Sequence, residues 1–213
     1  MEGTRLFRST RLAVRLIAIT GISLMGAGGA PASTVARVTV GEMLAVCELV
    51  FEGRVVESWA EEIPGGIRTW VRFEVLDVVK GPALGPTLDL AFLGGRIDDR
   101  IDEIVGLRVP EQDEHGIYFV ESLRRLQANP LYGWDQGRLI VRRDARGRER
   151  VVSARGRSVV GLEAGTRRPA TAELTTGSGP ASGVETDPDA QLEAALTPAA
   201  VKAALSAALG AAR

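Results

Sequence analysis

The chain has 213 residues and a net charge of −1, and 45% of its residues are apolar, 25% charged and 5% aromatic. This length suits one domain with appendages, and this composition suits a globular protein. The single Cys and the single His exclude an internal disulfide, a zinc site built only from Cys and His, and a metal motif with two His. Without the first 32 residues the net charge becomes −4, which excludes a generic polyanion-binding protein.

Residues 1–32 have the features of a secretory signal peptide. Four Arg precede an apolar stretch at 16–25, and small residues then lead to Ala30, Pro31 and Ala32. Gly residues end this stretch well below the roughly 20 apolar residues that a membrane anchor needs. We therefore expect cleavage after Ala32, a secreted or periplasmic protein, and no membrane span in the mature chain. A retained anchor is the alternative.

The mature chain begins with signals for a short helix and three strands. Thr39 and Glu42 have the spacing of a capping box, which predicts a helix over residues 40–47. Apolar residues separated by turn residues predict strands at 49–59, 69–76 and 87–93. Gly53, inside the first of these strands, marks a bulge or a close backbone approach. Three strands in succession favour an antiparallel meander.

Further strands follow a long polar connection at residues 96–114. The short apolar run at 117–120 predicts a strand buried on both faces or inside a small barrel. Segments 138–143 and 149–153 flank a turn in which Gly147 suits the left-handed position of a hairpin loop. About six strands and one helix predict a mainly β fold, a small antiparallel OB-like barrel.

The predicted barrel domain covers residues 33–162, and the composition changes after it. Residues 163–189 are rich in Gly, Ser, Pro and Thr, which predicts a flexible linker. Residues 190–213 predict an amphipathic C-terminal helix with Thr197 as N-cap and Pro198 at the first helical position. An apolar stripe recurs every four residues at Val201, Leu205 and Leu209. The sequence leaves three alternatives for this helix: it packs on the barrel, it contacts another molecule, or it is Ala-rich filler.

Two segments carry a resemblance to a known family. They read CELVFEGRVV at 47–56 and VRFEVLDVVKGP at 71–82, and a Gly pair follows at Gly94 and Gly95. The pattern resembles the netrin-like OB barrel of tissue inhibitors of metalloproteinases (TIMP-like proteins), and more closely uncharacterised secreted bacterial proteins that share this barrel. Inhibitors of that family reach the catalytic zinc with a free N-terminal Cys, whereas Cys47 is internal. The resemblance therefore implies the barrel and not the inhibitory chemistry.

The strongest local charge lies on the predicted hairpin, where residues 138–157 hold eight Arg and two acidic residues. A basic ridge of this kind would contact an acidic protein or an anionic glycan. Nucleic acid is not expected, because no aromatic residues are interleaved for base stacking. The plainer interpretation is solubility and protection of an exposed edge. The arginines expected to form the anionic contact are Arg142, Arg143, Arg146, Arg148 and Arg150.

Other candidate residues have plain interpretations. Any His-based catalysis needs His115, but its acidic neighbours suggest a solvated loop histidine. Cys47 is interpreted as a small buried residue. The acidic run at 98–103 offers oxygen ligands of the kind that calcium takes, but it lacks the spacing of a known loop and is interpreted as the charge of a solvated loop.

Aromatic residues add a last candidate. Three tryptophans could line a carbohydrate-binding groove: Trp59, Trp70 and Trp134. Trp70 lies on a predicted strand, where packing in the core explains it equally well. Carboxylate pairs for glycoside hydrolysis stay open, because their separation is a structural quantity. The sequence favours an exported, non-enzymatic module without cofactor or metal that binds an envelope or extracellular protein or an anionic glycan. A secreted hydrolase or protease inhibitor on the same barrel is the alternative.

Overall fold

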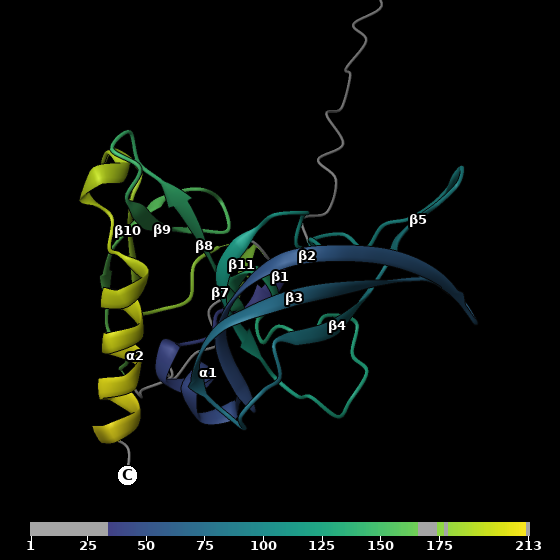
Figure 1. Cartoon of the computed structure of the whole chain (residues 1–213), viewed down its shortest axis with the longest axis horizontal. Helices are drawn as coiled ribbons and strands as arrows, with labels where there is room; N and C mark the ends of the chain where they lie inside the picture. The colour runs from purple at the N-terminus through teal and green to yellow at the C-terminus, as the bar shows by residue number, and fades with distance from the viewer. Residues whose placement is uncertain (1–33, 166–173, 177–178, 212–213) are drawn as a thin grey trace, which may run out of the picture. The chain divides into compact units, whose positions relative to one another are not determined.

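An antiparallel sheet organises the computed structural model, which describes residues 34–165, 174–176 and 179–211. Eight strands lie in the order β12-β10-β9-β8-β7-β2-β3-β4 (Figure 1). In chain order they are β2 (Leu49–Ile63), β3 (Gly66–Lys80), β4 (Thr87–Leu93), β7 (His115–Val120), β8 (Arg138–Arg143), β9 (Glu149–Ser153), β10 (Ser158–Leu162) and β12 (Val184–Asp187). The predicted signal peptide lies outside the described residues.

Smaller elements surround this sheet. Two strand pairs stand apart from it, β1 (Thr34–Ala36) with β11 (Leu174–Thr176) and β5 (Gly95–Ile97) with β6 (Arg100–Asp102). The helices are α1 (Val40–Val46) and α2 (Pro198–Ala211), with 3₁₀ turns η1 (Trp134–Gly137) and η2 (Leu192–Ala194). The mainly β prediction is confirmed. Within the described part of the chain no pairing joins β12 to β4, so the strands form a row and a closed barrel is not shown.

The hairpin of β2 and β3 is longer than predicted. Both strands have 15 residues, and they pair up to the turn at Pro64 and Gly65, where Gly65 has a φ of 90°. The register shifts between Glu52 and Gly53, which confirms the predicted irregularity. A Cβ on Gly53 would lie 2.6 Å from the Phe51 ring and 2.9 Å from a backbone oxygen of β3, so only Gly fits there.

Helix α1 is fixed at both ends by side chains. The Thr39 hydroxyl accepts a hydrogen bond of 3.0 Å from the Glu42 amide, so the predicted cap is confirmed. At the other end the Lys80 ammonium donates to the backbone oxygens of Leu44 at 2.7 Å and Cys47 at 2.5 Å. The lysine of the Lys-Gly-Pro segment thus ties the end of β3 to the end of the helix.

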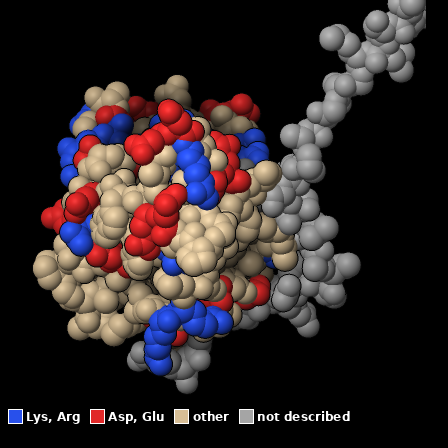
Figure 2. Space-filling view, turned by 90° about the vertical axis from the view of Figure 1, so that its right-hand side faces the viewer, with Lys and Arg blue, Asp and Glu red and all other residues tan. Residues whose placement is uncertain are grey.

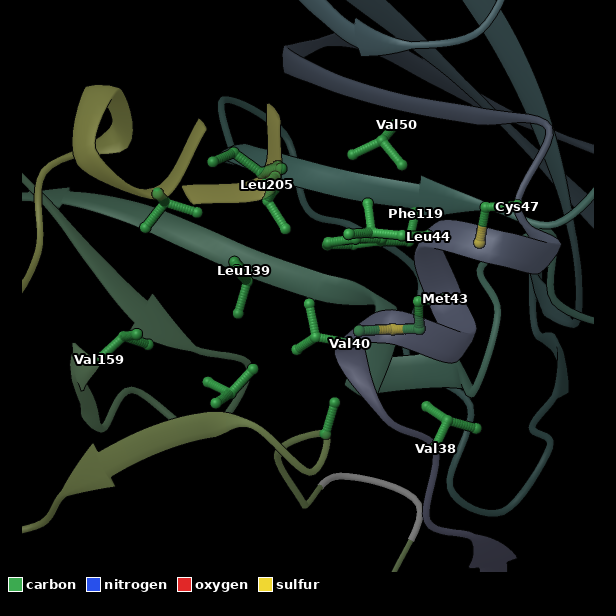
Figure 3. Close-up of a cluster of buried hydrophobic side chains, with 14 of the residues drawn as sticks. Val38, Val40, Met43, Leu44, Cys47, Val50, Phe119, Leu139, Val159 and Leu205 are labelled. Atoms are coloured by element: carbon green, nitrogen blue, oxygen red, sulfur yellow. The ribbon is translucent and has the colours of Figure 1, made fainter. Parts of the chain in front are cut away.

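The sheet has a core on each face. Alternate residues of β7 enter different cores, Ile117 and Phe119 on one side and Tyr118 and Val120 on the other. The first core lies beneath α1 and α2, and Figure 3 shows its buried hydrophobic side chains. The second core is built around three aromatic rings, whose centroids lie 4.8–5.5 Å apart: Phe51, Phe73 and Tyr118. The prediction of a strand buried on both faces is confirmed.

The interpretation of residues 163–189 as a flexible linker is wrong for part of this segment. Residues 174–176 form β11, and β12 pairs with β10 at the edge of the main sheet. Ala181 and Val184 are buried in the first core. Composition misleads here because a short edge strand is held by backbone hydrogen bonds and needs few apolar side chains. Residues 166–173 and 177–178 lie outside the described residues.

Helix α2 packs on the sheet, which was one of the alternatives left open by the sequence. The Thr197 hydroxyl accepts from the Ala200 amide at 3.2 Å, and Val201 and Leu205 are fully buried. Residues 192–211 are also long and apolar enough to cross a membrane, with a mean hydropathy of 1.4. Core helices of soluble proteins can have the same length and hydropathy, so these two properties do not distinguish a core helix from a membrane span.

Leu205→Ala is expected to lower the free energy of unfolding by about 2–5 kcal/mol, because the substitution leaves a cavity between α2 and the sheet. Chemical denaturation followed by circular dichroism measures the change. Ser206→Ala, on the exposed side of the same helix, is the matched control and should have little effect. Equal stability of the two variants would contradict the docking of α2.

Candidate functional site

Two tryptophans stack on the sheet face that bears α1 and α2. Trp59 of β2 lies directly opposite Trp70 of β3, with ring centroids 6.3 Å apart and ring planes inclined by 12°. On β3 the neighbours Val71 and Phe73 point the other way, into the second core. Trp59 keeps 37% of its surface exposed. The pair is therefore an ordered aromatic surface that solvent can reach.

Charged side chains border these rings. The Arg72 guanidinium lies 5.1 Å from the centre of the Trp59 ring and pairs with Glu57 and Asp89, both at 2.8 Å. The hydrogen bond from Arg72 lowers the pKa of Asp89, so this carboxylate stays ionised. The Trp70 indole donates to Glu61 at 2.8 Å. We call Trp59, Trp70 and Arg72 together the aromatic platform.

The aromatic platform contains only two of the three tryptophans that were predicted to line one carbohydrate-binding groove. Trp134 lies in η1 and lines a separate cavity of about 340 Å³, together with residues of β1 and the segment 127–133. Its φ of 61° marks a left-handed backbone. The three tryptophans thus do not form one groove. The sequence could not show this, because the pairing of Trp59 with Trp70 depends on the register of a long hairpin.

The interpretation of His115 as a solvated loop histidine is wrong. The residue begins β7, its side chain is only 10% exposed, and its Nε2 lies 2.9 Å from Oε1 of Glu52. The other carboxylate oxygen of Glu52 lies 2.6 Å from the Lys202 ammonium of α2. The hydrogen bond with His115 lowers the pKa of Glu52, although burial acts in the opposite direction. Glu52 is therefore a buried, ionised carboxylate with two partners.

A polar cavity lies beside His115. Its volume is about 310 Å³, and its lining comes from β2, β7, β8, β9 and the segment before β7: Arg54, Asp113, His115, Val141, Arg143 and Glu149. Arg54 lies opposite Glu74 on β3, two residues along the strand from Arg72. Because alternate residues share a face, this cavity and the aromatic platform open on the same face of the sheet. We call it the His115 cavity.

The hairpin of β8 and β9 forms as predicted, with the predicted bounds and with Gly147 at a φ of 75°. Its arginines do not form one ridge. Arg142 lies opposite Arg150, whereas Arg143 lies opposite Glu149 and pairs with it at 3.4 Å. The anionic contact itself stays a prediction.

Two of the five arginines hold the hairpin turn. The buried carboxylate of Asp144 contacts Arg148 at 2.9 Å and Arg150 at 3.2 Å. Arg150 also donates to the backbone oxygen of Ala195 at 2.9 Å. Their charge is therefore already paired within the fold. Sequence reasoning missed Asp144, whose position as the first residue after a strand and before a turn was the available signal.

Cys47 is buried, as predicted. Burial raises the pKa of its thiol to about 12, so the thiolate form is not available for chemistry at neutral pH. The acidic run at 98–103 is partly used in ion pairs, because Arg100 contacts Glu62 at 2.9 Å and Asp102 at 3.4 Å. In the described ranges there is no group of three or more His, Cys, Asp and Glu residues that could hold a metal ion.

The side of the molecule that carries the far ends of β2 and β3 has mixed charge. Figure 2 shows acidic and basic groups interspersed there, with uncharged surface between them. Ion pairs between exposed side chains, such as Arg100 with Glu62, account for part of this pattern. Opposite charges at close range cancel, so this side offers no extended patch of one sign.

No protein-family model, curated protein or solved structure matches the chain. Its function is therefore argued from the geometry of the described residues. Among the described residues, the lining of the His115 cavity holds no Ser, Thr or Cys, and its carboxylates are Asp113 and Glu149. The aromatic platform is held by contacts with neighbouring charged side chains, and Trp59 is open to solvent. It is the better candidate for the contact with a partner.

Asp144→Asn is expected to destabilise the protein at neutral pH and to have less effect in acid. Burial alone would raise the pKa of Asp144, but hydrogen bonds from Arg148, Arg150 and Arg146 lower it from 3.8 to about 2. The folded state thus binds fewer protons, so the stabilisation is present above pH 3.8 and is lost as the pH falls through about 2.

Thermal melts of wild type and variant at several pH values measure this difference. The gap between their Tm values should narrow as the pH falls from 3.8 toward 2. Asp99→Asn, which changes an exposed carboxylate, is the control and should show no such pH-dependent gap. A constant gap for Asp144→Asn would show that the ionised carboxylate does not stabilise the turn.

Proposed function

We propose that this protein is an exported, non-enzymatic binding module that holds a glycan on the aromatic platform. The observation that carries the proposal is the stacked, solvent-accessible pair of Trp59 and Trp70 bordered by fixed charged groups. The face of an indole ring carries negative charge density, which attracts the polarised C–H groups of a sugar ring. Apolar contact between the two flat surfaces also removes water from both.

The polar border supports the same ligand class. Carboxylates of Glu57, Glu61 and Asp89 surround the rings and retain oxygen lone pairs that accept hydrogen bonds from sugar hydroxyls. Their hydrogen bonds to Arg72 and Trp70 hold them in place before a ligand arrives, which reduces the entropy lost on binding. Because Arg72 is already paired with two carboxylates, this border favours a neutral sugar over an anionic one.

We include in the proposal that the fold is a netrin-like OB barrel variant. The order of a short helix, a long hairpin and a third strand supports this, and so does the role of Lys80 in joining β3 to α1. Gly81, the next residue, has a φ of 123°, and a Cβ there would lie 2.7 Å from the backbone oxygen of Glu48. These contacts give a physical reason for a Lys-Gly-Pro segment at this point of the chain.

Trp59→Ala and Trp70→Ala are each expected to weaken glycan binding at least about tenfold, which corresponds to about 1.4 kcal/mol. Affinity electrophoresis through soluble polysaccharides and pull-down with cellulose, chitin and purified bacterial cell-wall glycan measure the binding. Leu76→Ala removes another exposed apolar side chain from β3 and is the matched control. Wild-type binding by both tryptophan variants would overturn the platform as the site.

An anionic polysaccharide in the same assay tests the hairpin arginines. Arg142 and Arg146 are exposed, and their side chains hold neither Asp144 nor Glu149, so Arg142→Gln with Arg146→Gln removes charge and leaves the turn intact. Loss of retention in this double variant, with the tryptophan variants unaffected, would move the contact from the platform to the hairpin. Salt should weaken such binding, because exposed charges are screened.

Export is expected to remove residues 1–32. The basic start, the apolar stretch and the small residues before Ser33 motivate this prediction. Intact-mass measurement of protein from the extracytoplasmic fraction should give the mass of a chain that starts at Ser33. A full-length mass in that fraction would contradict cleavage, and protein found only in the cytoplasm would contradict export.

A further inference from the structure

The charges that line the His115 cavity are only partly used by the fold. Arg143 and Glu149 pair with each other at 3.4 Å. Arg54 and Asp113 line the same cavity, and within the described part of the chain neither side chain has a hydrogen bond or an ion pair. The Nε atom of Arg54 is also shielded from solvent without a partner. One cation and one anion therefore face this space unpaired.

Asp113 is held in place by the backbone around it. Its φ of 63° is left-handed, and its amide donates to the backbone oxygen of Val55 at 3.1 Å. The Val55 amide in turn donates to the backbone oxygen of Glu114 at 2.9 Å. These two hydrogen bonds fasten the segment before β7 to β2. Backbone in this sparsely populated region is commonly retained at binding sites.

His115 is fixed at the cavity by a carboxylate on each side. The Glu52 carboxylate can only accept hydrogen bonds, so the Nε2 atom that contacts it at 2.9 Å donates. The Nδ1 atom lies 3.9 Å from Oε1 of Glu149. Asp113 thus offers an acceptor beside the Arg54 donor.

We infer that the His115 cavity binds a small zwitterion, a molecule that carries one ammonium and one carboxylate group in the manner of an α-amino acid. The carboxylate pairs with the Arg54 guanidinium, and the ammonium donates to the carboxylate of Asp113. An anion without an ammonium group would leave Asp113 unpaired and would be repelled by its carboxylate. A cation without a carboxylate group would leave Arg54 unpaired and would be repelled by its guanidinium. The volume of about 310 Å³ lies at the lower end of ligand pockets, which suits a small molecule.

This binding site is distinct from the aromatic platform and does not depend on glycan binding. The residues of the cavity come from β2, β7, β8, β9 and the segment before β7, whereas the platform uses β2 and β3. Each proposal can therefore fail while the other stands. The Trp59→Ala variant should keep full affinity for the zwitterion.

The experiment compares three probes on the mature protein by NMR chemical-shift titration. Alanine carries both charges, alaninamide only the ammonium, and propionate only the carboxylate. We expect alanine to bind with a Kd of about 1 mM and the other two at least about tenfold more weakly. Arg54→Gln and Asp113→Asn should each weaken alanine binding at least about tenfold. Arg142→Gln, on β8 between the lining residues Val141 and Arg143 but outside the lining itself, is the control and should bind as wild type.

Circular dichroism confirms that each variant is folded before its titration. Equal binding of propionate and alanine would overturn the inference in favour of an anion site, and equal binding of alaninamide would overturn it in favour of a cation site. Absence of saturable binding of all three probes would also overturn it. Selective binding of alanine that is lost in both cavity variants and kept in Arg142→Gln supports it.

Discussion

Glu52 is a charged side chain buried in the sheet, and it requires partners of opposite charge or hydrogen-bond donors. One partner comes from β7 and the other from α2, so the positions of both elements depend on this carboxylate. Its side chain is only 9% exposed, and an ionised carboxylate without partners would cost several kcal/mol at this depth. His115 and Lys202 supply one contact to each of its oxygens. Lys202 also reaches Asp77 on β3, so one lysine fixes the rotation of α2 against two strands. The same carboxylate holds His115 at the edge of the cavity, where Nδ1 lies 3.9 Å from Glu149.

The long hairpin explains why a binding surface stands next to this core. Strands of 15 residues are far longer than the usual 5–6, and only the first half of β2 is buried in a continuous run. The outer half extends beyond the helices and needs stabilisation of its own. Trp59 with Trp70, and Arg72 with its two carboxylates, supply it across the strands. Contacts that hold the ribbon thus also present the aromatic surface to solvent.

Local signals in the sequence predicted both α-helices and six of the eight strands of the main sheet, but they predicted neither β10 nor β12 and no long-range contact. The cap at Thr39 and the hairpin around Gly147 were predictable, because turn and cap residues act on their immediate neighbours. His115 was interpreted as solvated because Glu52, its partner, lies 63 residues away in the chain. For the same reason β12 was interpreted as linker. The role of Asp144 was missed although its partners Arg148 and Arg150 are local in the chain. Side-chain pairing between distant strands is set by register and packing, which composition does not record.

Residues of the first core are made at very different times during synthesis. Lys202 pairs with Asp77 across 125 residues of chain, and Leu205 completes a core that begins at Val38. At a synthesis rate of about 5–20 residues per second, α1 and β2 wait on the order of ten seconds or more for α2. During that time α1 can cover only part of the apolar face of the sheet, and folding that depends on such distant contacts is slow. The part of this face that α2 covers therefore stays exposed in the nascent chain until the last helix is made.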